Sequence, residues 1–275
     1  MEKFNGKAIK NPLGKAGEYS YWGCYFYVGC SNGCTYCYLK KGRLAKACGG
    51  NVPTLKKCFK DKSHALEVFE KELQQNLPEL QKHGLFFSFT TDPFLKETKY
   101  LTNKAMEICC SNQVPMKFLS KKADWVINNS FPTHWGKGGD ECINELKKYA
   151  AFGFTLTGHD ELEPNASTNE ERIRASFELK SAGFKVFFSF EPVIDFSVTF
   201  HMICRLKDSC DLMKIGLMSG RKYDRKQLQI FIQDVLNVGT SAKIYFKDSL
   251  LQQAGISRSE LPANCVGRDY NMFNQ

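Results

Sequence analysis

The residues most suited to chemistry are three cysteines within the segment Gly29-Cys-Ser-Asn-Gly-Cys-Thr-Tyr-Cys-Tyr38. The two glycines of this segment let the backbone wrap, so three thiolates can converge on one centre. Structural zinc sites and electron-transfer clusters normally take four protein ligands. A three-cysteine motif therefore predicts an iron–sulfur centre that leaves one coordination position open for a small molecule. The predicted ligands are Cys30, Cys34 and Cys37.

Two other interpretations of the motif remain open. One is a zinc site completed by Cys24, Cys48, Cys58 or a distant histidine, and the other is three cysteines that only pack. The remaining cysteines, including the Cys109-Cys110 pair in a helical pattern, are predicted to be buried apolar side chains rather than ligands.

Composition indicates a cytoplasmic protein. Twelve cysteines in 275 residues without a secretion signal favour reduced thiols over a disulfide framework. The basic N-terminus leads into no apolar run, and no apolar stretch approaches the roughly 20 residues of a membrane span. No membrane association is expected.

Positive charge gathers around the cysteines. The chain carries a net charge of +9, and residues 1–61 contain eleven Lys or Arg against three Asp or Glu, which makes +8. This excess could steer an anionic partner such as nucleic acid toward the site, or serve only as a solvated surface.

Short apolar runs alternate with helical patterns along the chain. Amphipathic helices are predicted over Ser63–Asn76, around Leu228–Val235, and from a capping box at Ser167 and Glu170 to Gly183. Phe131–Asp140 is predicted to be a loop. The predicted strands are Cys24–Gly29, Leu85–Phe89, Pro115–Leu119, Phe152–Leu156, Lys185–Phe190, Leu212–Leu217 and Ala242–Phe246.

This alternation predicts an α/β fold with a parallel sheet, either doubly wound or curled into a full or partial barrel. A single domain over residues 1–275 is the simplest organisation. In both architectures ligands bind at the carboxyl ends of the strands. Polar residues follow these ends at Cys30, Thr90-Thr91-Asp92, Ser120-Lys121, Thr157, Glu191 and Ser219.

The cysteine spacing resembles the signature of the radical S-adenosylmethionine (SAM) enzymes. The resemblance is strongest to the spore photoproduct lyase-like group and extends from about Tyr21 to Ser219. It implies a partial (β/α)6 barrel of the TIM type over about residues 21–220, with a C-terminal strand and helix added. The matching segments are Cys34-Thr-Tyr-Cys-Tyr-Leu39, Phe89-Thr-Thr-Asp-Pro-Phe94, Ser120-Lys121, Glu163-Pro-Asn-Ala-Ser167, Glu171-Arg-Ile173 and Ala182-Gly183.

The resemblance also implies the cofactors. A [4Fe-4S] cluster on the three cysteines would bind SAM at its fourth iron, and one electron would cleave SAM to methionine and a 5′-deoxyadenosyl radical that abstracts hydrogen from substrate. An electron donor such as flavodoxin or ferredoxin is implied as a partner.

Carried over by position, the resemblance implies cofactor contacts for four residues. Tyr36 is expected near the adenine, Thr91 and Asp92 near the methionyl and ribose end of SAM, and Lys121 near its carboxylate. Taken alone, Lys121 reads as an exposed loop lysine, and Asp92 as part of a turn.

Two further cofactor contacts follow from strand ends. Thr157 and Glu191 follow the fourth and fifth strands, where a hydroxyl or carboxylate could bind ribose or substrate. The alternatives are a strand-end cap for Thr157 and a salt-bridged carboxylate for Glu191.

One position departs from the spore photoproduct lyase pattern. Thr90 stands where those enzymes carry a cysteine that donates hydrogen to the product radical, and a threonine O–H bond is too strong for that task. Unless another thiol such as Cys24 reaches the site, the same repair reaction is not expected. Tyr38 matches a tyrosine implicated in radical return and is the predicted catalytic residue.

The sequence thus predicts a radical SAM enzyme acting on an unidentified substrate, with DNA or RNA as the first candidate. A protein, peptide or metabolite substrate is the second possibility. The third is a non-catalytic iron–sulfur or zinc module that binds nucleic acid through the basic segment and exposed aromatic side chains. That module would use Tyr19, Tyr21, Trp22, Tyr25, Phe26 and Tyr27, which are more simply explained as a buried strand.

Overall fold

The computed structural model describes residues 3–42, 44–127 and 139–273. Its central element is an eight-stranded sheet in the order β1-β2-β5-β6-β7-β8-β9-β10. Strand β1 is antiparallel to β2, and the other neighbouring strands are parallel. The strands are β1 (Ile9–Lys10), β2 (Gly23–Cys24), β5 (Leu85–Phe87), β6 (Met116–Ser120), β7 (Ala150–Thr155), β8 (Lys185–Val193), β9 (Leu212–Leu217) and β10 (Lys243–Phe246).

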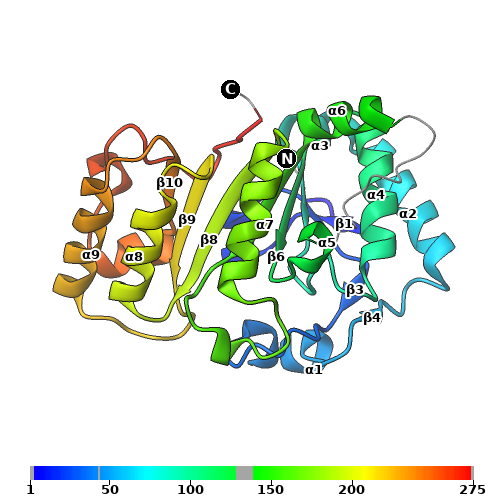
Figure 1. Cartoon of the computed structure of the whole chain (residues 1–275). Helices are drawn as coiled ribbons and strands as arrows, with labels where there is room; N and C mark the ends of the chain where they lie inside the picture. Colours follow the sequence, from blue (N-terminus) through cyan, green and yellow to red (C-terminus); the bar gives the residue numbers. More distant parts are fainter. Residues whose placement is uncertain (1–2, 43, 128–138, 274–275) are drawn as a thin grey trace.

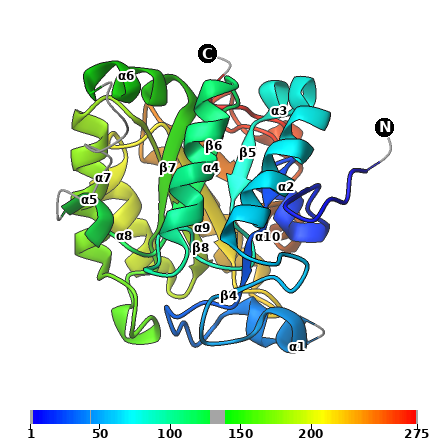
Figure 2. The same ribbon diagram turned by 90° about the vertical axis from the view of Figure 1, so that its right-hand side faces the viewer.

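Helices cover the outer face of this sheet (Figures 1 and 2). A separate two-stranded ribbon joins β3 (Tyr27–Val28) to β4 (Thr54–Leu55). The helices are α1 (Leu44–Cys48), α2 (Lys62–Gln75), α3 (Leu77–His83), α4 (Lys99–Ser111), α5 (Asp124–Ile127), α6 (Gly139–Tyr149), α7 (Asn169–Ser181), α8 (Phe196–Leu206), α9 (Arg225–Asn237) and α10 (Asp248–Ala254). No helix in the described ranges is long and apolar enough to cross a membrane.

The sheet is rolled into a partial barrel. Strands β6 and β9 are separated by two strands, which in a flat sheet puts them about 14 Å apart. Nevertheless, the amino groups of Lys117 on β6 and Lys214 on β9 both contact the backbone carbonyl of Tyr19. Tyr19 also contacts Phe86 of β5 and Glu191 of β8, so four strands surround this residue and the sheet curls around it, while β1 and β10 remain as open edges. The predicted partial barrel is confirmed.

Alternation along the strands separates two cores. On β6, Phe118 belongs to the large apolar layer between sheet and helices, whereas Leu119 packs with the inner layer. The inner layer lines the lumen and also contains Phe86, Phe187 and Tyr245. The residues of every second position therefore face the inside of the barrel.

Most predicted elements are present, with shifts at their ends. Strand β9 has the predicted bounds, but the run Cys24–Gly29 divides between β2 and β3. The capping box of α7 is Thr168 with Glu171, one residue later than expected. The predicted loop Phe131–Asp140 lies outside the described residues up to 138, and α6 begins at Gly139.

Candidate metal and cofactor site

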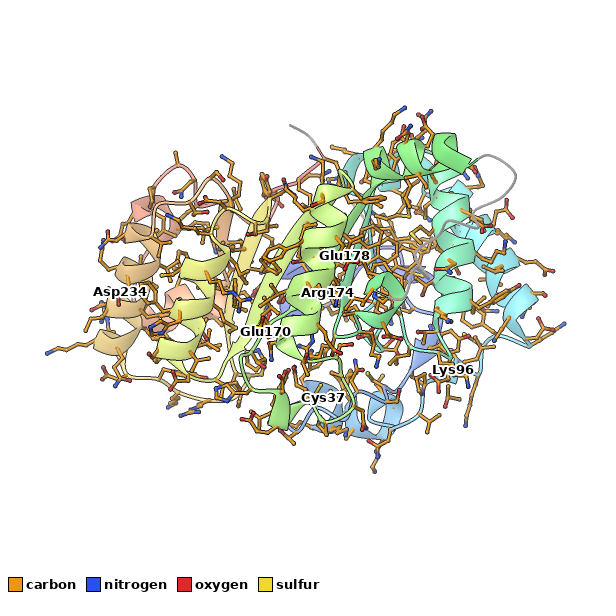
Figure 3. The ribbon with its side chains drawn as sticks, viewed as in Figure 1. Cys37, Lys96, Glu170, Arg174, Glu178 and Asp234 are labelled. Atoms are coloured by element: carbon orange, nitrogen blue, oxygen red, sulfur yellow. The ribbon has the colours of Figure 1, made fainter. Side chains whose placement is uncertain are left out.

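The cysteine loop, residues 29–38, directly follows β3, within the connection from β3 to β4, and lies at the carboxyl-end edge of the sheet. Figure 2 shows α1 and β4 at this edge, and Figure 3 marks Cys37 there. Gly29 and Gly33 have φ values of +85° and +74°, a region that favours glycine. A Cβ atom on Gly29 would also lie 2.6 Å from the Val52 carbonyl oxygen. The predicted wrapping of the loop is therefore present and depends on glycine.

Backbone hydrogen bonds hold the loop from two sides. The Cys30 N–H donates to the Gly50 carbonyl (3.0 Å) and the Thr35 N–H to the Leu162 carbonyl (3.0 Å). These partners come from the segment after α1 and from the connection between β7 and α7. The loop is thus fixed before any metal binds.

The three predicted ligands line one small cavity together with Cys48. In the described part of the chain, no three His, Cys, Asp or Glu side chains are close enough to hold a single metal ion. A structural zinc draws its four ligands to within about 2.3 Å of one point. A four-iron cluster gives each thiolate its own iron, and three thiols that line one cavity fit such a cluster.

Burial raises the pKa of two of the three predicted ligands, Cys30 and Cys34. Burial first, and then the Asp92 carboxylate, raise the pKa of Cys30 to about 12. The pKa of Cys34 is raised by burial as well, against the opposing effect of Lys121. Metal ligation requires the thiolate, so loading a cluster must release protons from these side chains.

Asp92 is saturated by donors from the protein. Its Oδ1 accepts from the Phe94 N–H (3.0 Å) and the Ser120 hydroxyl (2.7 Å). Its Oδ2 accepts from the Asn32 side-chain amide (2.8 Å) and the Lys121 N–H (2.7 Å). The carboxylate therefore ties the cysteine loop to the ends of β5 and β6, and a cofactor contact of its own would break one of these bonds.

Two buried polar atoms beside this carboxylate lack a partner. The hydroxyl oxygen of Thr91 and the side-chain oxygen of Asn32 form no hydrogen bond with any described residue. An unpaired buried polar group costs about 1–3 kcal/mol. These two atoms could each bind a polar group, and Asn32 was not among the residues predicted from the sequence.

A fully buried ion pair supports the cysteine loop from below. Arg172 donates from its guanidinium to Glu163 (2.5 Å), and the Tyr36 hydroxyl donates to the same carboxylate. The Lys121 amino group lies 4.0 Å from Glu163 and 5.7 Å from the Tyr36 ring centroid. Burial lowers the pKa of Lys121, but Cys34, once it is deprotonated, and Glu163 together outweigh burial and raise the pKa of the lysine.

Lys121 keeps 20% of its side chain exposed. The structure thus brings Tyr36 and Lys121 together, and adds Glu163 as a carboxylate that contacts both. It does not place Lys121 on an open loop, which was the simpler interpretation.

Tyr38 lies at the mouth of the barrel, 46% exposed, and its hydroxyl donates to the Phe89 carbonyl. The nearby Thr90 hydroxyl donates to the Tyr27 carbonyl (2.6 Å). Cys24, the thiol that could have replaced the missing cysteine, is 1% exposed in the outer apolar layer. It therefore faces away from the lumen and does not reach the site.

Thr157 and Glu191 match their structural alternatives. Thr157 is fully buried and its hydroxyl accepts from the His159 N–H (3.3 Å), which is a strand-end cap. Glu191 is salt-bridged to Lys247 (2.8 Å) and accepts from the Tyr19 hydroxyl. Glu191 does border the lumen, whereas Thr157 has no surface open to it.

The aromatic residues proposed for base stacking are mostly buried. Trp22, Tyr25, Phe26 and Tyr27 are each 5% exposed or less, and only Tyr21 is open, at 46%. A stacking platform needs exposed rings. The non-catalytic nucleic-acid-binding module therefore loses its main support.

No family model and no curated protein matches the chain. Solved structures do match. The chain has the fold of spore photoproduct lyase. The structure of that lyase with bound AdoMet and dinucleoside spore photoproduct aligns with a TM-score of 0.53 at 15% identity, over 78% of this chain and 61% of the lyase.

A second match is SuiB of Streptococcus suis. Its structure bound to S-adenosylmethionine aligns with a TM-score of 0.54 at 12% identity, covering 90% of this chain and 50% of SuiB. Its structure bound to the precursor peptide SuiA gives 0.56 at 11% identity, over 87% and 52%. The chain thus spans between 50% and 61% of the length of these proteins. The resemblance expected from the motifs is confirmed at the level of the fold.

Proposed function

We propose that the protein is a radical SAM enzyme that binds a [4Fe-4S] cluster through Cys30, Cys34 and Cys37. The observation that carries this proposal is a three-thiol loop, built on two glycines, beside two buried polar atoms that lack partners. Its place at the carboxyl ends of parallel strands is where ligands bind in such folds. The SAM-bound structures among the fold neighbours support the choice of cofactor.

The protein residues would bind and orient SAM. We propose that Lys121 binds the carboxylate of SAM. Its side chain is partly exposed, and its backbone directly follows the end of β6. We assign polar contacts to Thr91 and Asn32, because their buried atoms need partners. When bound, cluster and SAM together supply a radical that abstracts hydrogen from substrate.

Other predicted residues take supporting roles in this proposal. Asp92 positions Asn32 and Lys121 through its hydrogen bonds, and Tyr36 packs next to Lys121 while bonded to Glu163. Thr157 caps β7. Glu191 borders the lumen, where it is available to a substrate rather than to SAM.

Tyr38 is the candidate for radical return. Its ring is partly exposed at the barrel mouth between the cysteine loop and Phe89. We expect Tyr38→Phe to retain the cluster and SAM cleavage but to form less product for each 5′-deoxyadenosine released. Equal product yields in Tyr38→Phe and wild type, measured by mass spectrometry, would remove Tyr38 from the mechanism.

The deciding experiment is reductive SAM cleavage. The protein is purified without oxygen, reconstituted with iron and sulfide, and reduced with dithionite, or with flavodoxin or ferredoxin as the proposed physiological donor. SAM is added and 5′-deoxyadenosine is quantified by chromatography. We expect cleavage in the wild type and in Cys58→Ala, whose thiol is exposed, and none in Cys34→Ala.

The same samples distinguish the metal. Four irons per chain with a cluster absorption band support the proposal, while bound zinc or a loaded cluster that never cleaves SAM contradicts it. Cys48→Ala adds a check, because Cys48 lines the same cavity. We expect this variant to keep the full iron content if three cysteines suffice.

Nucleic acid is the substrate that the surface charge favours. Lys40, Lys41 and Lys46 are exposed on the segment directly after Cys37, where they can attract phosphates. Thymine photoproduct repair by a thiol donor is not proposed, because Thr90 holds that position and Cys24 points away. Binding of DNA and RNA at several salt concentrations tests this assignment, and an affinity that does not fall with salt contradicts it.

A further inference from the structure

Three lysines project into the lumen of the barrel, from β6, from β9 and from the end of β10. Lys117 and Lys214 are each 7% exposed, and Lys247 is 3% exposed. Burying a charged amino group is costly unless it is paired. The contacts of each lysine therefore show whether its amino group is compensated by the protein or needs a ligand.

Lys247 is fully compensated. Its amino group lies 2.8 Å from Glu191 and 3.5 Å from Glu18, which is itself 5% exposed. Glu18 comes from the segment between β1 and β2, seen in blue behind β6 and β8 in Figure 1. This pairing joins the open edge of the barrel to the inserted N-terminal segment.

Lys117 and Lys214 are not compensated. Their amino groups lie 3.4 and 3.3 Å from the same backbone carbonyl of Tyr19. Lys214 also lies 4.4 Å from the centroid of the Tyr19 ring. Among the described residues, no carboxylate lies within 4.0 Å of either amino group. Two amino groups thus share one neutral acceptor.

This pair of lysines is one aromatic layer away from the cysteine loop. The Tyr19 ring packs against Phe86 and Phe89, with centroids 5.5 and 6.2 Å apart. The Phe89 carbonyl in turn accepts from the Tyr38 hydroxyl at the barrel mouth. The lysines therefore lie one aromatic layer below the barrel mouth.

We propose that Lys117 and Lys214 form a binding site for an anionic group of the substrate, a carboxylate or a phosphate ester. Two ammonium groups from strands on either side of the lumen match the charge and the several acceptor oxygens of such a group. The binding itself does not depend on the proposed radical chemistry. Only the assignment of the anion to the substrate rests on the proposed function.

The electrostatics of the lumen agree with this geometry. Burial lowers the pKa of Lys117 to about 8. Burial, and then the charges of Lys117 and Lys247, lower the pKa of Lys214, against Glu191 and Glu18. A bound anion favours the charged form of both amines. Anion binding near pH 8.5 should therefore take up protons, which is a signal that a surface lysine would not give.

The test uses full-length protein reconstituted with its cluster, and two probes, sulfate for a phosphate ester and acetate for a carboxylate. Thermal unfolding is followed against chloride at the same ionic strength. We expect one probe to raise the midpoint by about 3–5 °C in a saturable way. Calorimetry at pH 8.5 in two buffers of different ionisation enthalpy should report proton uptake.

Methionine variants identify the site. Met keeps an unbranched chain of similar length, so Lys117→Met and Lys214→Met remove the charge and should still fold. We expect each to weaken binding at least tenfold and the double variant to abolish it. The matched control is Lys148→Met, whose side chain is 61% exposed.

Each outcome decides the proposal. A saturable shift that survives in the double variant, or no saturable shift with either probe in the wild type, overturns the site. Displacement of the probe by SAM would assign the lysines to the cofactor and overturn the substrate assignment. The same titration in Cys34→Ala separates the two proposals. If the anion binds to this variant but the wild type does not cleave SAM, the anion site stands and the proposed radical chemistry is wrong.

Discussion

The cysteine loop and the lumen below it differ in how far their buried ionisable side chains are satisfied by partners within the protein. Around the loop, Asp92 accepts four hydrogen bonds and Glu163 is paired with Arg172. In the lumen, Lys117 and Lys214 share a single carbonyl. The charged groups of the first region, the scaffold of the cysteine loop, have partners within the protein, whereas in the second region two buried amino groups share one neutral acceptor.

The difference shows what each region needs from outside. The charged groups of the scaffold are satisfied by the protein, and its unpaired atoms are the neutral oxygens of Thr91 and Asn32. A cofactor can enter there without rearranging an ion pair. The lumen lacks a negative charge instead, so the two regions should respond differently to substitution.

The largest effect should come from breaking the buried pair of the scaffold. Glu163→Gln leaves Arg172, which has no exposed surface, without its charge partner. We expect a loss of about 3–5 kcal/mol in the free energy of unfolding, measured in urea. Glu170→Gln, which breaks an exposed pair with Arg205, should cost less than about 1 kcal/mol. Similar losses in both variants would show that burial of the pair does not matter.

A smaller loss is expected from Asp92→Asn. The amide keeps the shape of the carboxylate, but its NH2 group can only donate hydrogen bonds. It would therefore face the donors on Asn32 and Lys121 without accepting from them. We expect unfolding to become easier by about 1–3 kcal/mol, together with weaker SAM binding, because Asn32 and Lys121 lose their anchor. If SAM affinity fell while stability stayed at the wild-type value, Asp92 would be a direct ligand instead.

An effect of opposite sign belongs to the lumen. Lys117 has a folded-state pKa of about 8, below the ordinary lysine value of 10.5. The unfolded chain therefore binds more protons between these values, so the free energy of unfolding rises with pH from about 8 to 10.5. Lys117→Met should remove this rise and should be as stable as the wild type, or more so, at pH 7.

Denaturant unfolding of Lys117→Met and wild type at pH 7, 8, 9 and 10 checks this prediction. A constant difference across the series would mean that Lys117 stays charged in the folded protein. Lys148→Met again serves as the control, because the ion pair of this exposed lysine with Glu145 raises the pKa of Lys148 and keeps it charged over this pH range.

Local rules were enough for the loop and most elements. Gly29 and Gly33 predicted the wrapped backbone, and both have positive φ. The capping box was misplaced by one residue because Ser167 uses its hydroxyl to accept from the Ala123 N–H, across the connection to α5. The strand run Cys24–Gly29 divided because its second half pairs with β4, which the sequence pattern does not reveal.

The sequence by itself determined which residues could hold a cluster, because those thiols lie within one short loop whose glycines set its shape. Only the tertiary structure decided what surrounds them. Tyr19 meets Lys117 and Lys214 from 98 and 195 residues away, and Glu163 reaches Tyr36 across 127. Contacts of this kind depend on how far the sheet curls, and the curl is a property of all its strands packed together.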